Sequence, residues 1–506
     1  MQDIPTSLKK YQTYIDGKWC DAASGKTFQT SDPYTGEPWA VIPECDATDV
    51  DRACNAAARA FESGPWPSMT ATARGHILRK IAMLLEKHGE HLAQIEVRDN
   101  GKLISEMSAQ LKYLPEWYYY YGGLADKVNG MVVPCDKPDT FAYTLREPVG
   151  VCGLIIPWNS PLLLVGYKLA PALAAGCTVV IKPSEYTSAS LLEFIKLVVE
   201  EAGVPPGVIN VVTGFGGVAG EALITHPKVA KVAFTGGSLT GSRVASVAAA
   251  NFKKVSLELG GKSPNIVFDD AILDDAVNGA ISGIFAATGQ TCVAGSRLLV
   301  QESIHDKFVE KLLATAKTAK LGNPMSFETQ VGPVTTPPQY QKVLSYIDIA
   351  KSEGAQCVLG GGPAGPELGG GKYFVQPTVF TGVNNKMRIA QEEVFGPVLS
   401  VIKFKDEEDA IRIANDVIYG LAAGVWTQNV KRATIMPRRI RAGTVWVNTY
   451  RAISYTMPFG GFKSSGLGRE NGQDAINEYL DTKAVWVSTA SNSGNPFIMK
   501  TSAPTR

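Results

Sequence analysis

One nearly uncharged segment constrains the fold more than any other feature of the sequence. Between residues 149 and 181 the only charged side chain is that of Lys168, and about 20 apolar residues in one helix are enough to span a membrane. Proline ends or kinks a helix, and three prolines interrupt this segment: Pro157, Pro161 and Pro171. We therefore expect a buried strand, an apolar helix and a second buried strand, over residues 151–156, 161–175 and 177–181.

The same alternation of strand and helix continues along the chain. Further strands are expected at residues 208–212 and 229–234, with helices at 188–202, 217–225 and 241–250. A long amphipathic helix is expected earlier, at 70–100. A second series has strands at 265–268 and 298–301 and helices at 273–288 and 306–320. Apolar strands separated by helices are typical of a parallel sheet covered on both faces, so we predict an α/β protein with two doubly wound domains.

Two short β-prone segments lie outside both series. Residues 141–146 and 483–488 are expected to pair as an arm beyond the two cores, and such arms tend to bridge subunits. The last residues, 489–506, are rich in Ser, Asn, Thr, Pro and Gly. We expect them to be mobile.

Charge and composition argue against several classes of partner. The 506 residues carry 49 Lys and Arg against 48 Asp and Glu, a net charge of +1. Nucleic acids and anionic membrane surfaces bind clustered basic charge, so neither is expected as a partner. The first ten residues contain no apolar run, so we expect no secretory signal.

The cysteines and histidines indicate neither disulfides nor a metal site. Eight cysteines are dispersed through the chain without paired spacing, which favours a reducing, cytoplasmic compartment. His88 and His91 lie three residues apart on an expected helix, but no further Cys or His lies near them to complete a metal site. We therefore expect no bound metal.

Two glycine-rich turns follow expected strands, where backbone N–H groups at a helix N-terminus can hold the phosphates of a dinucleotide. Residues 214–219 match the dinucleotide fingerprint, with Ala in the third glycine position, and residues 236–241 do not. The acidic residue expected about 20 residues after the fingerprint is absent, because no carboxylate lies between Glu221 and Glu258. The residues alone leave both turns open as phosphate sites.

Four polar side chains close expected strands or turns, and each has two interpretations. Lys182 and Glu185 lie at the carboxyl edge of the sheet, where they either hold the ribose of a nucleotide or form an ordinary surface turn. Cys292 is flanked by glycines and is either a nucleophile or a small buried residue. Glu258, between two leucines at a strand end, is either ion-paired or a base with a raised pKa.

Seven motifs join these segments, and together they resemble the aldehyde dehydrogenase superfamily over residues 14–487. The motifs, in the order of the family, are Pro157-Trp158-Asn159, Lys182-Pro183-Ser184-Glu185, Phe234-Thr235-Gly236, Leu257-Glu258-Leu259-Gly260-Gly261, Gly289-Gln290-Thr291-Cys292, Glu392-Glu393-Val394-Phe395-Gly396-Pro397 and Pro458-Phe459-Gly460-Gly461. One such match is weak, whereas seven in one order leave little room for chance. The resemblance favours the functional interpretation of each motif.

The resemblance implies the NAD-dependent oxidation of an aldehyde to a carboxylic acid. Cys292, as thiolate, would attack the aldehyde carbonyl to give a thiohemiacetal and then a thioester. Asn159 and the backbone N–H of Cys292 would stabilise the oxyanion. Glu258 would activate the water that hydrolyses the thioester, and Lys168 would help to relay the proton.

The resemblance also implies an NAD site, and it distinguishes between the two glycine turns. The turn after Phe234 would lie beside the cofactor, and the fingerprint match at 214–219 would be a false one. Glu185 would favour NAD over NADP, because its carboxylate repels a 2′-phosphate. The implied cofactor-binding residues are Ile155, Pro157, Trp158, Lys182, Ser184, Glu185, Phe234, Gly236, Gly237, Leu259, Glu393 and Phe395.

Several residues depart from the pattern of the family. Gly237 stands where relatives commonly have Ser, and Gln473 stands where many have a second glutamate for proton relay. Small residues replace tunnel aromatics at two positions, Ser160 and Ala286, which predicts a wide tunnel and a bulky hydrophobic or aromatic aldehyde. Arg451 leaves a carboxylate-bearing semialdehyde open as the substrate. The implied substrate-binding residues are Ser160, Leu164, Tyr167, Ala286, Thr291, Val293, Ile453 and Phe459.

Two further functions stay open on the same scaffold. One is a CoA-acylating aldehyde dehydrogenase, against which the intact Glu258 counts, because such enzymes need no hydrolytic base. The other is a non-catalytic structural or binding protein.

The resemblance further implies a homodimer or homotetramer and a small-molecule aldehyde as the partner. The expected division is an NAD-binding domain over residues 1–135 and 148–258, a catalytic domain over 259–450, an arm over 136–147 and 482–490, a return segment over 451–481 and a mobile tail over 491–506.

Overall fold

The computed structural model describes residues 8–365, 370–492, 495 and 497. Most of the predicted tail, residues 491–506, lies outside the described residues, as do residues 1–7 of the predicted NAD-binding domain.

Eight strands form a first sheet around the apolar segment, in the order β22-β12-β11-β8-β9-β10-β2-β3. The central strands β8 to β12 are all parallel, with Cys152 opposite Val179 and Phe234 opposite Ile155. The antiparallel strands β2, β3 and β22 close the two edges. The bounds are β2 (Thr13–Ile15), β3 (Lys18–Cys20), β8 (Val151–Ile155), β9 (Thr178–Lys182), β10 (Ile209–Val211), β11 (Val229–Thr235), β12 (Lys254–Glu258) and β22 (Gly466–Leu467).

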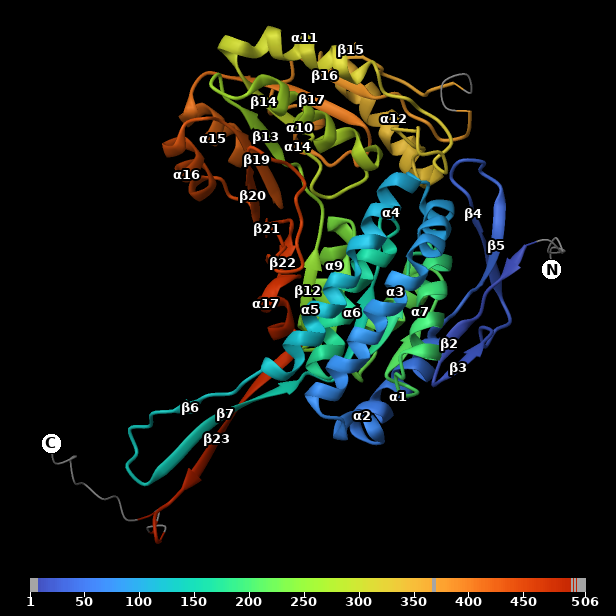
Figure 1. The fold of residues 1–506 in the computed structure, drawn as a ribbon, viewed down its shortest axis with the longest axis vertical. Coiled ribbons are helices and arrows are strands. Elements are labelled where there is room, and N and C mark those ends of the chain that lie inside the picture. Colours follow the sequence, from blue (N-terminus) through green and yellow to red (C-terminus); the bar gives the residue numbers. More distant parts are fainter. Residues whose placement is uncertain (1–7, 366–369, 493–494, 496, 498–506) are drawn as a thin grey trace.

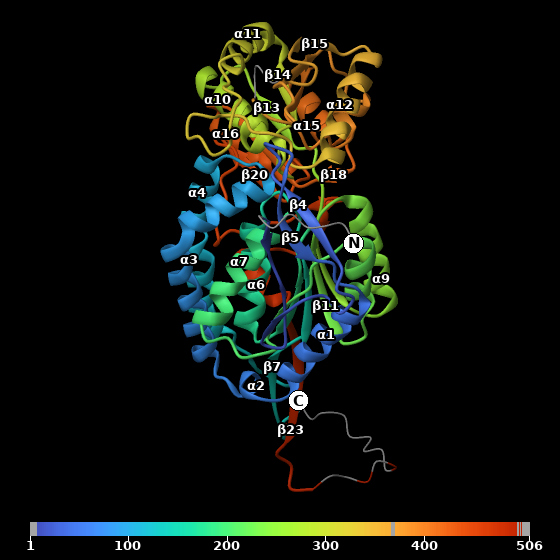
Figure 2. The same ribbon diagram turned by 90° about the vertical axis from the view of Figure 1, so that its right-hand side faces the viewer.

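Helices cover both faces of this sheet, as Figure 2 shows. Helices α3, α4, α5, α6 and α7 share one buried core, and α1, α8 and α9 share another. The long helix predicted at residues 70–100 is confirmed as α3. The bounds are α1 (Ala47–Glu62), α3 (Ala71–Asn100), α4 (Ile104–Tyr113), α5 (Pro115–Leu124), α6 (Pro161–Ala175), α7 (Ser188–Glu201), α8 (Glu221–Thr225) and α9 (Ser238–Ala250).

Helix α6 is the apolar helix that the prolines predict. Pro161 is its first residue, where the missing N–H leaves no bond unmade, and Gly176 ends it in the left-handed conformation at φ 99°. Pro171 lies inside the helix and does not end it. Apart from Leu164, the residues of this helix are buried, including Lys168, so this cation must find its partners within the protein.

A second, seven-stranded sheet has the order β15-β16-β17-β14-β13-β19-β20. Helices α10 and α11 contribute to the core on one side, and α12, α14, α15 and α16 contribute to the other. The strand bounds are β13 (Pro264–Val267), β14 (Arg297–Gln301), β15 (Gln356–Leu359), β16 (Thr378–Thr381), β17 (Val398–Phe404), β19 (Ala422–Trp426) and β20 (Thr444–Val447). The helix bounds are α10 (Leu273–Phe285), α11 (His305–Ala316), α12 (Pro337–Ser352), α14 (Arg388–Gln391), α15 (Glu407–Asn415) and α16 (Val430–Arg439).

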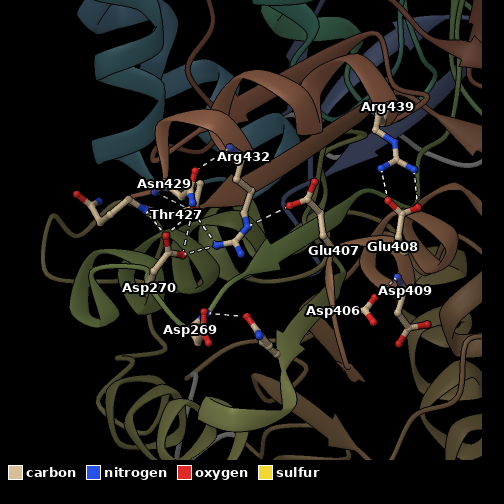
Figure 3. Close-up of polar contacts among 12 residues, drawn as sticks. Asp269, Asp270, Asp406, Glu407, Glu408, Asp409, Thr427, Asn429, Arg432 and Arg439 are labelled. Atoms are coloured by element: carbon tan, nitrogen blue, oxygen red, sulfur yellow. Dashed lines mark hydrogen bonds and ion pairs between the residues drawn. The ribbon is translucent and has the colours of Figure 1, made fainter.

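Ion pairs fasten α15 and α16 to this sheet, as Figure 3 shows. Arg432 lies 2.9 Å from Asp270 and 3.5 Å from Glu407, and its guanidinium stacks 4.0 Å from the ring centroid of Phe268. Arg439 at the end of α16 pairs with Glu408 at the start of α15. A guanidinium held by two carboxylates and an aromatic ring is well compensated for its partial burial, so this network is a structural one.

The predicted arm is confirmed as a separate sheet. Strand β7 (Thr140–Pro148) pairs with β23 (Leu480–Ser488) along their full lengths, and the two-residue β6 (Val132–Val133) adds to β7. The arm extends away from the rest of the molecule (Figure 1) and exposes large apolar side chains such as Trp486 at 64% and Val132 at 71%.

Short elements complete the described chain. A three-stranded sheet of β1 (Lys9–Lys10), β5 (Pro38–Pro43) and β4 (Thr27–Ser31) lies near the N-terminus, and β18 (Tyr419–Gly420) pairs with β21 (Phe462–Lys463). The remaining helices include α2 (Pro65–Ser68) and α17 (Gly472–Asn477). Within the described residues, no helix is both long and apolar enough to cross a membrane.

Candidate functional site

A cavity of about 170 Å³ lies at the carboxyl ends of β8, β11 and β12, where residues of the second α/β unit form its other wall. Ligands of doubly wound folds bind at such carboxyl ends. The cavity brings together residues that are far apart in the sequence. Its lining is Pro157, Trp158, Asn159, Leu164, Thr235, Gly236, Gly237, Glu258, Leu259, Gly260, Cys292, Gln339, Lys342, Glu393 and Phe395.

Cys292 reaches this cavity from a turn with unusual backbone geometry. Helix α10 ends at Phe285, three residues before the predicted end, and Ala287 and Thr288 follow with φ of 53° and 54°. Gly289 must be glycine, because a Cβ there would lie 2.1 Å from the carbonyl oxygen of Gly396. Burial raises the pKa of the Cys292 thiol to about 12, and the nearby carboxylates of the site add to this. The thiol is therefore protonated at neutral pH.

Asn159 lies in the connection from β8 to α6, and its buried side chain lines the same cavity as Cys292. Its amide Nδ2 donates to the carbonyl oxygen of Gln290 at 3.0 Å. An amide nitrogen carries two donors, so one N–H remains for a substrate oxygen.

Glu258 is the last residue of β12 and is 3% exposed. Neither of its carboxylate oxygens has a hydrogen-bond partner in the described structure. Burial raises its pKa well above the usual value, the charge of Glu470 raises it further, and the charge of Lys168 opposes the shift. An unpaired carboxyl with a raised pKa is suited to accept a proton from water near neutral pH.

Lys168 lies behind Glu258 and forms a buried ion pair. Its Nζ donates to Thr235 Oγ1 at 2.6 Å and to Glu470 Oε1. Glu470 is 302 positions away in the chain, and sequence reasoning missed it because no local pattern predicts so distant a partner. Gln473, which was expected at the position of a second glutamate in relatives, is exposed on α17, whereas Glu470 is the glutamate that binds Lys168.

A second cavity, of about 330 Å³, continues the first. The two share the wall formed by Pro157, Trp158, Thr235, Gly236 and Gly237. All twelve predicted cofactor residues line one or the other. The lining of the second cavity is Ile155, Ile156, Pro157, Trp158, Lys182, Ser184, Glu185, Tyr186, Gly216, Gly220, Glu221, Ile224, Phe234, Thr235, Gly236, Gly237, Thr240, Arg243 and Val244.

The polar groups of the second cavity suit a dinucleotide. The Lys182 ammonium is buried and lies 3.8 Å from the Glu185 carboxylate, and burial lowers the pKa of Lys182. Gly237 precedes the first turn of α9, where backbone N–H groups lack helical partners and attract phosphate. A Cβ on Gly237 would meet no atom within 4 Å, so this edge is open to a ligand.

The other glycine turn, at residues 214–219, is the one predicted to be a false match. Gly216 and Gly220 line the same cavity as Gly236, so both turns border it. Gly214 itself packs against Cys45, since a Cβ there would lie 2.8 Å from the Cys45 carbonyl oxygen.

Helix α12 forms part of the wall of the first cavity. The sequence did not indicate this role of α12. Gln339 Nε2 donates to the carbonyl oxygens of Val394 at 2.8 Å and Phe395 at 3.0 Å. Phe395 needs this support because its φ is 59°. Its ring meets Trp158 edge to face at 5.3 Å, which fixes the aromatic wall near Cys292.

The predicted substrate residues are less closely gathered. Of the eight, only Leu164 lines the cavity at Cys292. Ile453 is exposed at 37%, while Tyr167 and Val293 are buried. The remaining four are buried or partly buried: Ser160, Ala286, Thr291 and Phe459.

An aromatic cluster surrounds Tyr167, and most of it was missed from the sequence. Trp117 stacks on Tyr167 at 5.2 Å, Tyr455 meets Trp117 at 5.8 Å, and Phe459 lies 6.3 Å from Tyr167. Arg451, by contrast, donates to the Ser282 carbonyl oxygen. The described residues contain no group of three or more His, Cys, Asp or Glu with the arrangement of a metal site.

Comparison with known sequences gives consistent matches. The profile of the aldehyde dehydrogenase family matches residues 19–485. Over 496 residues the chain is 48% identical to a (Z)-2-((N-methylformamido)methylene)-5-hydroxybutyrolactone dehydrogenase of Acinetobacter baylyi, with 97% of this chain and 100% of that protein covered. It is 46% identical over 480 residues to aldehyde dehydrogenase family 2 member C4 of Arabidopsis thaliana, with 94% and 95% covered.

Solved structures give the same result. An NAD+ complex of aldehyde dehydrogenase from Bacillus cereus has a TM-score of 0.93 at 45% identity, covering 96% of this chain and 99% of that one. Betaine aldehyde dehydrogenase from Staphylococcus aureus in complex with NAD+ has a TM-score of 0.95 at 42% identity, covering 96% and 97%. The predicted α/β fold with two doubly wound units is confirmed.

Proposed function

The chain belongs to the aldehyde dehydrogenase family, and we propose that it oxidises an aldehyde to the carboxylic acid with NAD as the hydride acceptor. One observation carries the proposal: a thiol, an amide with a free N–H and an unpaired carboxyl line one cavity that is continuous with a groove suited to a dinucleotide.

The first step is attack by Cys292 on the aldehyde carbon. Because burial raises the pKa of its thiol to about 12, the proton must leave as the sulfur attacks, and Glu258 is the carboxyl in the same cavity that accepts it. The free N–H of Asn159 and the backbone N–H of Cys292 hold the oxyanion of the thiohemiacetal.

Lys182, Glu185 and the N-terminus of α9 would hold the adenosine and phosphates of NAD, and Glu393 and Phe395 the nicotinamide ribose. NAD bound there would supply the acceptor for the hydride that leaves the thiohemiacetal. Once Glu258 has released the thiol proton to solvent, it removes a proton from the water that hydrolyses the thioester. The pair of Lys168 and Glu470 behind it tunes its pKa.

We propose a bulky hydrophobic or aromatic substrate. The aromatic cluster of Trp117, Tyr167, Tyr455 and Phe459 supports this, because aromatic side chains contact apolar rings and chains well. A semialdehyde is the second candidate, supported by Arg451 at partial exposure. The unpaired Glu258 counts against CoA acylation, and the complete site counts against a non-catalytic protein.

The arm supports assembly into a homodimer or homotetramer, since its exposed apolar strands resemble an unpaired edge. All eight cysteines are free, which supports a reducing, cytoplasmic compartment. The two sheets support the division into an NAD-binding domain over 1–135 and 148–258 and a catalytic domain over 259–450, with an arm over 136–147 and 482–490 and a return segment over 451–481.

The test is a panel of aliphatic, terpenoid, aromatic and acidic aldehydes, with NAD or NADP, followed by the absorbance of the reduced nicotinamide. The chain should turn over bulky apolar aldehydes with NAD, and Cys292→Ala should form no reduced cofactor while still binding NAD. A preference for acetaldehyde would refute the substrate class, and turnover by Cys292→Ala would refute the nucleophile.

A further inference from the structure

The turn before Cys292 is held in a conformation that its own residues disfavour. Ala287, Thr288 and Gly289 lie consecutively in the left-handed region, at φ of 53°, 54° and 70°. Only glycine adopts this region readily, because a Cβ crowds the following carbonyl. Groups outside the turn must therefore hold Ala287 and Thr288 in place.

The strongest of these outside contacts comes from the first α/β unit. Glu106, in the first turn of α4, accepts a hydrogen bond from the backbone N–H of Ala287 at 2.6 Å. The bond joins residues 181 positions apart. A carboxylate acceptor makes this bond stronger than one to a neutral group. Thr288 adds a weaker tie, from its Oγ1 to the Gly332 carbonyl oxygen at 3.2 Å.

The same short segment holds the other half of the oxyanion site. Lys102 Nζ donates to Ser160 Oγ at 2.6 Å, and Asn100 Nδ2 contacts the Asn159 carbonyl oxygen at 3.5 Å. Lys102 is 6% exposed, and burial lowers its pKa to about 8 while the charge of Glu106 opposes the shift. Residues 100–106 thus contact both the Asn159 connection and the turn before Cys292.

We propose that Glu106 is a positioning residue for the attack of Cys292 on the aldehyde. Glu106 is absent from the lining of the 170 Å³ cavity, so it acts through Ala287. By holding the strained turn, it sets the backbone N–H of Cys292 and the amide of Asn159 at the spacing that one oxyanion requires. The inference rests on the proposed function, because it concerns the first step of that reaction.

The experiment combines removal of the contact with removal of the strain. Glu106→Ala should slow the pre-steady-state burst of NADH by about 10-fold to 100-fold, the range for small misplacement of reacting groups. The dissociation constant for NAD should stay unchanged, because Glu106 does not line the dinucleotide groove. Glu106→Gln keeps an oxygen acceptor for the Ala287 N–H and should retain most of the burst rate.

The double variant Glu106→Ala with Ala287→Gly is the decisive comparison. Glycine adopts φ near 53° without strain, so the double variant should regain most of the lost burst rate. If Glu106→Ala alone does not fold, a double variant that folds and shows an NADH burst would still support the inference that Glu106 holds the strained turn. Glu90→Ala, on the exposed face of α3, is the matched control.

Three outcomes would overturn the inference. One is a burst rate in Glu106→Ala equal to that of Glu90→Ala. Another is equal loss in the Gln and Ala variants at position 106, which would indicate a need for charge rather than position. The third is no recovery on adding Ala287→Gly. A wild-type chain without aldehyde oxidation would instead refute the proposed function.

Discussion

Replacing Glu258 by Gln should separate the two halves of the reaction and also stabilise the fold. The substitution keeps the size of the side chain but removes its ability to accept a proton. Lys168 keeps its bonds to Thr235 and Glu470, so the buried ion pair behind Glu258 stays paired. The effect is therefore confined to one carboxyl that has no hydrogen-bond partner in the described structure.

The kinetic effect follows from the role of a general base, which contributes about 10²-fold to 10⁴-fold. That range corresponds to about 3 to 5 kcal/mol of transition-state stabilisation. In Glu258→Gln the steady-state rate of NADH formation should fall by this factor, after a burst that approaches one NADH per active site. Stopped-flow absorbance resolves the burst, which should be slower than in the wild type because Glu258 also takes the thiol proton.

The stability effect has the opposite sign and depends on pH. Because burial raises the pKa of Glu258 in the folded state, the wild-type chain loses stability as pH rises from about 4.3, the unfolded value, through the folded pKa. Every tenfold weakening of the acid by the fold costs about 1.4 kcal/mol once the carboxyl is ionised. Gln does not titrate, so the midpoint of thermal unfolding of the variant should exceed that of the wild type at pH 8 and approach it at pH 5.

Two results would contradict this reasoning. An unchanged steady-state rate would show that Glu258 is not the base. A variant less stable than the wild type at pH 8 would show that the fold stabilises the ionised carboxylate. That result would contradict the described structure, in which the carboxylate oxygens have no hydrogen-bond partner. Glu90→Gln, on the exposed face of α3, controls for the loss of one negative charge and should change neither measurement.

Two further substitutions test neighbouring residues. Glu185→Ala removes the carboxylate 3.8 Å from the Lys182 ammonium. The preference for NAD over NADP should fall by about tenfold, because the 2′-phosphate of NADP then meets the Lys182 cation without the repelling carboxylate. A wild-type chain that prefers NADP would contradict the role given to Glu185. Glu470→Gln removes a charge that raises the pKa of Glu258, so the acidic limb of the pH profile of kcat should move to lower pH. The same substitution leaves Lys168 without its buried carboxylate partner and should lower the free energy of unfolding by about 3 kcal/mol. A stationary acidic limb would exclude Glu470 from the tuning of Glu258.

The spacing of apolar residues was enough to predict the helices and strands whose apolar faces are buried. The apolar helix from Pro161 to residue 175, the long helix before Asn100 and the paired arm all follow from spacing and proline positions, and the structure has them. The expected helix at 273–288 was wrong at its end. Apolar periodicity continues through Ala287, whereas the structure turns at Phe285 because Glu106 and Gly332 hold the next residues in the left-handed region.

Site residues that lie in a family motif could be predicted from the sequence. A residue whose pKa depends on a partner far away in the chain could not. All twelve predicted cofactor residues line the two joined cavities. The pairing of Lys168 with Glu470 spans 302 positions and joins a helix to a loop of the return segment. No spacing rule connects these two residues. The expectation about a second glutamate was placed on Gln473, three residues after Glu470.

This distant pair explains how one carboxyl acquires a pKa suited to a base. Burial and the charge of Glu470 both raise the pKa of Glu258, and the charge of Lys168 lowers it. Because Lys168 and Glu470 are bound to each other, their effects on Glu258 oppose and partly cancel, which leaves burial as the main cause of the raised pKa. Neutralising either partner alone must then move the pKa of Glu258 in opposite directions, upward without Lys168 and downward without Glu470. A buried ion pair next to an unpaired acid can thus set the pH range of the reaction without contacting the substrate.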